Sequence, residues 1–393
     1  MITVDSESFL TVVTVAALAA LLGGLAARRM VVPVVVLEIL LGILVGPELL
    51  NLAQPDPFLE FFAGLGLGML FFFAGFEIDF ERLRGVPLRL GLLGWVISLA
   101  LAYSIGGVLA LAGVVVSLLF TGTAMATTAI GTLIPILGDA GELRTRFGRY
   151  VLAAGAMAEF GPIVLITIVF STKSATSNAL ILLAFVAGSV GAAVIAVRGM
   201  VRGWGLLERT LETSGQLAVR LAVVMVFALG ALAASLGLEL LLGGFLAGVI
   251  VRVALKGREI EVLQSKLTAV AYGFFIPFFF VVSGIKFNLS ALTDDPVELF
   301  KLPLFLALFL VVRGVPAVAL YRRLLDRRDR LALAFYSATE LPLVVAITTI
   351  AVERGHMRSS TAASLVGAAV LSTAIYPLVA LRLRATRVPA PAA

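Results

Sequence analysis

Thirteen apolar runs follow one another along the chain, each long enough to cross about 30 Å of hydrocarbon as a helix. They fall at residues 9–27, 31–47, 58–78, 90–112, 114–136, 149–171, 178–198, 216–236, 238–254, 268–285, 301–321, 331–352 and 360–381. Of the 393 residues, 61% are hydrophobic and 14% are charged, far from the composition of a soluble domain. The sequence predicts an all-α integral membrane protein with a single membrane domain, residues 1–393.

The basic residues of this chain collect in alternate loops between the apolar runs. If the N-terminus lies outside, most of the 30 lysines and arginines fall on the cytoplasmic side, beginning with Arg28 and Arg29. The positive-inside rule therefore predicts an outer N-terminus and a cytoplasmic C-terminus. The same bias explains the net charge of +6 without a nucleic-acid partner. The first run lacks a basic leader, which favours a retained helix over a signal peptide.

Glycine spacing indicates that the chain repeats itself. Leu41-Gly-Ile-Leu-Val-Gly46 resembles Gly243-Gly-Phe-Leu-Ala-Gly248, and Gly75 matches Gly284 within two further similar segments. Runs 1 to 6 (about 9–171) then match runs 8 to 13 (about 216–381), with a linker helix at 178–198. Because seven helices separate each pair, the repeat is inverted, as in many transporters. The alternative is that small-residue packing motifs recur in any bundle of membrane helices.

Runs 5 and 12 hold matched positions in the two halves, and both contain helix-breaking features. Run 5 is rich in hydroxyls and glycine around Thr127 and Thr128, and run 12 contains Pro342, which disfavours helical geometry at Leu341. Unwound backbone frees carbonyl groups, which suit a hard cation such as an alkali ion. A simple proline kink with threonines bonded to their own helix is the alternative. The symmetric pair favours two broken, crossing helices.

Three charged residues lie near mid-depth in the predicted membrane helices: Glu159, Arg313 and Glu340. An acidic residue at a helix centre costs roughly 2.5 to 3.5 kcal/mol, so such residues usually bind, relay or pair with something. The guanidinium of Arg313 can neutralise one carboxylate, and the other must then hold a proton or a cation. Competition for one carboxylate would produce antiport. Alternatively, both acids are structural partners of Arg313 and of the broken helix ends.

The other ionisable residues carry weaker hypotheses. We expect Glu38 to have a structural role. We expect Glu77 and Asp79 to form a solvated helix end, and an acidic funnel that attracts cations is the alternative. Arg220 can extend to the interface, and His356 lies in a predicted outer loop. The chain has no cysteine and a single histidine, so a thiolate metal site is excluded and no cofactor or enzymatic chemistry is expected.

The order of these motifs resembles the membrane domain of the monovalent cation:proton antiporter superfamily, in particular bacterial sodium/proton exchangers and the membrane part of potassium-efflux systems. The resemblance rests on the broken threonine-rich helix, the acid of run 6, the base of run 11 and three segments: Gly42-Ile-Leu-Val-Gly-Pro47, Phe73-Ala-Gly-Phe-Glu-Ile-Asp79 and Pro277-Phe-Phe-Phe-Val-Val-Ser-Gly284.

This resemblance implies a thirteen-helix fold with a dimerisation domain and a core domain, a homodimer, and elevator-like alternating access. By position, Glu159 takes the place of the ion-binding acid, Arg313 that of the base, and Thr127 and Thr128 lie in the crossover. Many relatives carry two polar residues where this chain has Ala158 and Glu159. We therefore expect Glu340 to pair with Arg313, and one proton to exchange for one sodium or potassium ion without net charge movement.

The chain ends at Ala393 after the last run, so no tethered cytoplasmic regulatory domain is expected, although a separate regulatory subunit stays open. Two other functions also stay open. A cation channel or membrane sensor could keep the fold without proton coupling, which Ala158 favours. A transporter of larger anionic solutes could use Arg313 as its binding group, but the paired acids would repel an anion.

Overall fold

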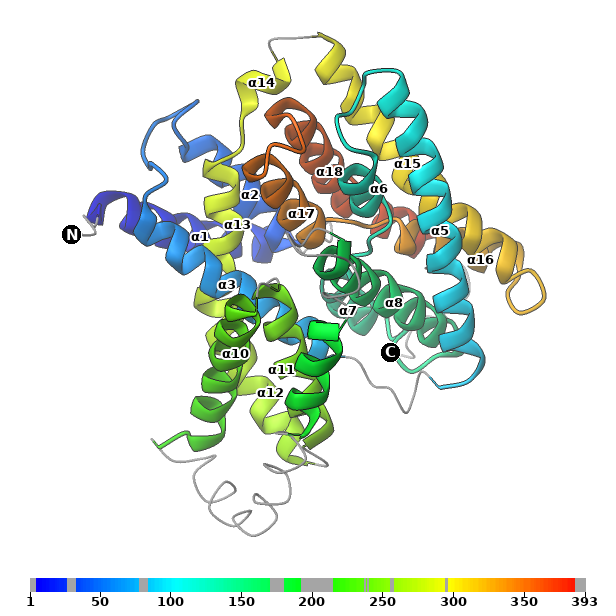
Figure 1. Ribbon diagram of the computed structural model, residues 1–393, viewed down its shortest axis with the longest axis horizontal. Coiled ribbons are helices and arrows are strands. Elements are labelled where there is room, and N and C mark those ends of the chain that lie inside the picture. Colours follow the sequence, from blue (N-terminus) through cyan, green and yellow to red (C-terminus); the bar gives the residue numbers. More distant parts are fainter. Residues whose placement is uncertain are drawn as a thin grey trace. The chain divides into compact units, whose positions relative to one another are not determined.

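The computed structural model describes residues 5–26, 33–77, 84–169, 180–191, 215–236, 238, 240–254, 258–293 and 296–385 (Figure 1). Within these ranges, every regular element is a helix. Nine described helices are long and apolar enough to cross a membrane, and four shorter apolar helices accompany them at Val34–Val45, Leu118–Ile134, Leu180–Gly191 and Leu241–Ala254. Each of the thirteen predicted runs coincides with one of these helices, so the predicted all-α membrane fold is confirmed.

A few of the residues named above lie outside the described ranges. They include Arg28, Arg29, Asp79, Ala393 and residues 178–179 and 192–198 of the predicted linker helix. The division of the chain into two repeats of six helices stays a prediction. The contacts divide it instead into two compact units, and each unit takes segments from both predicted repeats.

The first unit comprises Met1–Ala16, Leu52–Asp79 and Ile163–Ser283. Its helices are α3 (Pro57–Phe76), Leu180–Gly191, α10 (Leu217–Ser235), α11 (Leu240–Ala254), α12 (Arg258–Val270) and the π-helical turn η1 (Ala271–Phe275). Three helices have residues in both units: α1 (Ser6–Ala26), α8 (Arg146–Val169) and α13 (Ile276–Ile285). Helix α3 begins sharply, because the Asp56 carboxylate accepts a hydrogen bond from Leu59 N at 2.7 Å and Pro57 needs no partner at the first position.

The second unit comprises Ala17–Asn51, Phe80–Pro162 and Gly284–Ala393. Its helices are α2 (Val34–Val45), α5 (Val86–Leu111), α6 (Leu118–Met125), α7 (Ile130–Asp139), α14 (Leu289–Thr293), α15 (Pro296–Leu320), α16 (Arg327–Ser337), α17 (Pro342–Glu353) and α18 (Ser359–Ala385). Helices α15, α16 and α18 pack against one another, and α5 packs on α6 and α15. All the candidate site residues belong to this unit.

Glycines allow helix backbones to touch within the first unit. A methyl group added at Gly75 of α3 would overlap the carbonyl oxygen of Phe245 in α11, and one added at Gly248 of α11 would overlap that of Phe72 in α3. In Figure 1, α3, α10 and α11 run beside one another in this unit. Lipid tails are as apolar as leucine, so burying apolar side chains between helices gives no hydrophobic driving force in a membrane. Close contact between the helix backbones stabilises the pair by van der Waals packing instead.

The second unit contains the counterpart of this contact. Gly284 lies against the carbonyl oxygen of Ile39 in α2, and Gly46, which ends α2, lies against the backbone of Ile285. The predicted repeat pairs α2 with α11 and α3 with α13. If the predicted repeat holds, α3 touching α11 and α13 touching α2 are equivalent contacts.

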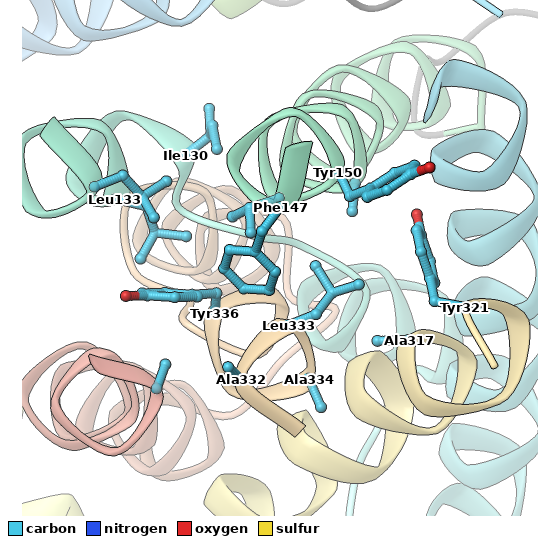
Figure 2. Close-up of a cluster of buried hydrophobic side chains, with 14 of the residues drawn as sticks. Ile130, Leu133, Phe147, Tyr150, Ala317, Tyr321, Ala332, Leu333, Ala334 and Tyr336 are labelled. Atoms are coloured by element: carbon cyan, nitrogen blue, oxygen red, sulfur yellow. The ribbon is translucent and has the colours of Figure 1, made fainter. Parts of the chain in front are cut away.

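A cluster of buried side chains holds α7, α8, α15, α16 and α18 together near one end of the second unit. Figure 2 shows Phe147 beside Tyr336 at the centre of this cluster and Tyr150 facing Tyr321 at its side. The ring centroids of the first pair lie 6.2 Å apart and those of the second 5.3 Å. Aromatic pairs in these tilted arrangements stabilise beyond simple contact area.

An ionic cluster adjoins the aromatic one and involves the last helix. Arg384 of α18 donates to both carboxylate oxygens of Glu142, at 2.7 and 3.0 Å, and to Asp329 at 2.7 Å. Its guanidinium also lies 4.3 Å from the ring centroid of Phe147. Because both acids are buried, losing the arginine would leave uncompensated charges. The cluster ties the α7–α8 turn and the start of α16 to the end of α18.

We expect Gly75→Ala to destabilise the protein, because the added methyl group meets the backbone of α11 and has no flexible neighbour to displace. Overpacking of this kind costs about 1 to 3 kcal/mol. Gly64→Ala in the same helix is the matched control, since a methyl group at Gly64 meets nothing within 4 Å. Thermal unfolding of the purified protein in detergent tests the pair. Equal melting temperatures for the two variants would contradict the proposed α3–α11 contact.

Candidate functional site

Two helices of the second unit are interrupted in the positions that the sequence predicted. Helix α6 ends at Met125 and α7 begins at Ile130, and α16 ends at Ser337 and α17 begins at Pro342. The second interruption has a clear local cause, because the proline ring conflicts with the carbonyl group four residues earlier. The prediction of two broken helices is confirmed.

The two interruptions touch through their backbones. Ala129 N donates to Thr339 O at 2.8 Å, and Thr128 Oγ1 donates to Ser337 O at 2.5 Å. Each of these carbonyl groups lies where regular helix geometry is lost. The two breaks therefore satisfy one another, and the crossing becomes a defined structure in place of two independent kinks.

Arg313 of α15 binds the crossing from one side. Its guanidinium donates to Thr128 Oγ1 at 3.1 Å and to the carbonyl of Ser337 at 3.3 Å, so one side chain contacts both breaks. It also donates to Ser98 Oγ in α5 at 2.9 Å and to Ala154 O in α8 at 3.3 Å. Arg313 is only 3% exposed. One buried cation thus joins α5, α8, α15 and both interruptions.

Glu340 lies within the second break and is completely buried. Its Oε2 lies 3.3 Å from Thr127 Oγ1, and Thr127 Oγ1 also donates to Ala124 O at 3.0 Å. Glu340 Oε1 has no hydrogen-bond partner among the described residues. The two adjacent crossover threonines therefore divide the charged groups, since Thr127 contacts the carboxylate and Thr128 the guanidinium.

Helix α18 supports the backbone of Glu340. Its N–H donates to Ser372 Oγ at 3.0 Å, and its carbonyl oxygen accepts from Ser372 Oγ at 3.0 Å and Thr373 Oγ1 at 3.2 Å. Both hydroxyl residues are fully buried. They supply the hydrogen bonds that the broken helix cannot make for itself.

Glu159 lies in α8 and is 5% exposed. It follows Gly155 by one helical turn, so the two residues share a face of the helix. A methyl group added at Gly155 would lie against the side chain of Ile130, the first residue of α7. The face of α8 that carries Glu159 is therefore the face that packs at the first break.

The structure corrects two expectations about the site. No ion pair joins Arg313 to Glu340 in the described part of the chain; the guanidinium donates to Thr128, Ser98 and two carbonyl oxygens. The carbonyl groups of the breaks are also less available than expected, since those of Ser337, Thr339 and Glu340 already accept hydrogen bonds. Carboxylate oxygens are thus the better candidates for cation ligands here.

Sequence reasoning missed the neutral partners of the site. Ser98, Ser372 and Thr373 were not singled out, although each places a hydroxyl group in an apolar helix, whereas Ser337 contributes its backbone carbonyl. That placement is a usable signal, because a hydroxyl in such a helix often bonds across to a neighbouring one. The carbonyl of Ala154 carries no signal in the sequence, because every residue has one.

Comparison with known proteins identifies relatives over nearly the whole chain. The family model described as "Sodium/hydrogen exchanger, transmembrane" matches residues 14–381. YjbQ of Bacillus subtilis is 27% identical over 371 residues, covering 89% of this chain and 59% of YjbQ. "Probable Na(+)/H(+) antiporter 3" of Methanocaldococcus jannaschii is 26% identical over 359 residues, covering 90% of each chain. This chain therefore spans somewhat over half of YjbQ and most of the second relative.

A solved structure has the same fold. The structure of "the sodium proton antiporter MjNhaP1" from Methanocaldococcus jannaschii at pH 8 superposes with a TM-score of 0.70, covering 96% of both chains at 17% sequence identity. At this identity the likeness concerns the arrangement of the helices.

We expect Ser372→Ala to destabilise the protein by about 1 to 3 kcal/mol, because it leaves the buried N–H of Glu340 without a partner. Thr349→Ala is the control, since the Thr349 hydroxyl bonds to Val345 O within its own helix α17. Thermal unfolding in detergent measures both. A Ser372→Ala protein as stable as Thr349→Ala would show that α18 does not hold the break.

Proposed function

Because the chain belongs to the sodium/hydrogen exchanger transmembrane family, we propose that it is a secondary antiporter that exchanges sodium or potassium ions for protons across the membrane. The cation and the proton compete at Glu159, and Arg313 is the fixed counter-charge. The observation that carries this proposal is that one compact unit holds one buried guanidinium, Arg313, and two buried carboxylates, Glu159 and Glu340.

Charge balance supports a one-for-one exchange. With both acids ionised, the two carboxylates and Arg313 sum to one negative charge. One proton or one monovalent cation restores neutrality, whereas holding both would leave a net positive charge in a poorly solvated site. Since a buried charge without compensation is costly, the site favours one or the other. Exchange on these terms moves no net charge.

Several further features belong to this proposal. We propose that the protein is a homodimer in a bacterial inner membrane, with the N-terminus outside and the C-terminus in the cytoplasm, as the distribution of basic residues indicates. Alternating access is of the elevator type, with the crossing carried as part of a moving body. Supporting this, all five site residues belong to one compact unit. A separate regulatory subunit is compatible with this arrangement.

We expect Glu159→Gln to abolish cation-driven pH change in proteoliposomes, because the amide can neither exchange a proton nor offset the charge of a cation. Glu353→Gln is the control, since Glu353 is exposed at the end of α17 in the same unit. A pH-sensitive dye inside the vesicles reports exchange when sodium or potassium is added outside. Exchange by Glu159→Gln at the rate of Glu353→Gln would refute the assignment of Glu159.

We expect the exchange rate of the wild type to be unaffected by a membrane potential set with valinomycin and a potassium gradient, because one charge moves in each direction. Sodium-driven exchange at positive, zero and negative potential measures this. A rate that follows the potential would contradict one-for-one exchange. A steady cation current with no pH change would instead identify a channel that kept the fold.

A further inference from the structure

One end of the second unit carries a set of exposed arginines that the transport site does not use. They come from three segments: the α7–α8 turn with the start of α8, the turn after α15, and the end of α18. Each is next in sequence to a residue that belongs to, or packs against, the buried cluster around Phe147 and Tyr336, so the three segments end together. We call this set the arginine face: Arg144, Arg146, Arg149, Arg322, Arg323 and Arg382.

The positive charge of the arginine face has little compensation at the surface. Two acids of the same segments, Glu142 and Asp329, are buried, and both accept hydrogen bonds of 2.7 to 3.0 Å from Arg384. A third acid, Asp326, is exposed, and its carboxylate caps α16 by accepting from Asp329 N at 2.9 Å. No carboxylate in the described part of the chain forms an ion pair with the arginine face. Its guanidinium groups are therefore available to an anionic partner.

The surface next to the arginine face is apolar. A methyl group added at Gly94 of α5 would lie 3.6 Å from the side chain of Leu320, so the start of α5 runs beside the end of α15, which Arg322 and Arg323 follow. Both helices expose large apolar side chains: Leu92, Leu93, Val96, Val311 and Val315. In a membrane such side chains contact lipid tails. Acyl chains and guanidinium groups are thus neighbours here, as the tails and the phosphate are in a phospholipid.

We propose that the arginine face binds the phosphate groups of anionic phospholipids, with Arg322 and Arg323 as the principal contacts because they adjoin the apolar surface. A planar guanidinium pairs with phosphate through two parallel hydrogen bonds. Clustered basic residues at a membrane surface also attract anionic headgroups. The competing explanation is that these arginines only fix the orientation of the chain in the membrane. That role requires positive charge and no preference for one lipid, so the two explanations differ in a measurable way.

Native mass spectrometry of the purified protein in an uncharged detergent tests this proposal. The protein is mixed with equal amounts of phosphatidylglycerol and phosphatidylcholine that carry the same acyl chains, and the retained lipids are counted. We expect the wild type to retain mainly phosphatidylglycerol, and Arg322→Gln combined with Arg323→Gln to weaken that retention by about tenfold. Arg354→Gln combined with Arg358→Gln is the matched control, since both arginines are exposed and Arg358 lies before the opposite end of α18. Equal retention of both lipids by the wild type, or of phosphatidylglycerol by the two double variants, would overturn the proposal.

Inorganic phosphate distinguishes a lipid site from a site for a soluble anion. A large molar excess of inorganic phosphate should leave phosphatidylglycerol bound, because the free ion lacks the acyl chains that contact α5 and α15. Displacement of the lipid by phosphate would assign the arginine face to a soluble anion and overturn the proposal. None of these measurements requires ion exchange, so their failure and the failure of the proposed function are distinguishable.

Lysine substitutions separate recognition of phosphate from attraction by charge. Arg322→Lys combined with Arg323→Lys keeps both charges and removes the paired donors of the guanidinium. We expect this variant to retain several-fold less phosphatidylglycerol than the wild type, and equal retention would overturn bidentate recognition by these two residues. Thermal unfolding without lipid should be the same for all variants, because the substituted side chains are exposed. If the Arg322 and Arg323 variants prove unstable, Arg144→Gln combined with Arg149→Gln provides the same test within the arginine face.

Discussion

The placement of one guanidinium organises the second unit. Arg313 cannot lose its proton under any physiological condition, so its charge must be accommodated wherever the fold buries it. The structure accommodates it with hydrogen bonds to Ser98, Thr128 and the carbonyls of Ala154 and Ser337. These acceptors come from a helix on each side and from both interrupted helices. A charge that would be expensive alone thus becomes the point where five segments meet.

This arrangement explains why two helices can be broken inside a membrane. Each unpaired backbone group in hydrocarbon costs several kcal/mol, so interruptions persist only where other protein groups satisfy them. Here the first break donates to the second through Ala129, and α18 supplies two hydroxyl groups to Glu340. The breaks are therefore parts of one hydrogen-bonded structure.

Much of the fold could be predicted because lipid imposes a simple rule on the sequence. Each of the thirteen apolar runs coincides with a helix, or with a pair of helices around a break, in the described part of the chain, and Pro342 together with Thr127 and Thr128 identified the two breaks. The partners of Arg313 could not be predicted in the same way. A salt bridge between Arg313 and Glu340 was expected because both residues lie near mid-depth in the membrane. The depth of a residue does not determine the direction in which its side chain points around the helix axis. The acceptors that replaced the carboxylate are two hydroxyls and two backbone carbonyls, and backbone carbonyls are identical in every residue.

The absence of a direct bond between Arg313 and Glu340 has a consequence for coupling. A salt bridge in contact would hold the carboxylate ionised, since breaking a buried pair by neutralising one partner costs about 3 to 5 kcal/mol. Because Thr127 and Thr128 lie between the two charged groups, the attraction of Arg313 for the Glu340 carboxylate is weaker than in a contact pair. The N-terminus of α17 stabilises the carboxylate by only about 0.3 to 2 kcal/mol. These terms oppose a burial penalty of several kcal/mol. Opposing terms of similar size leave the charge of Glu340 less firmly fixed than a contact ion pair would leave it.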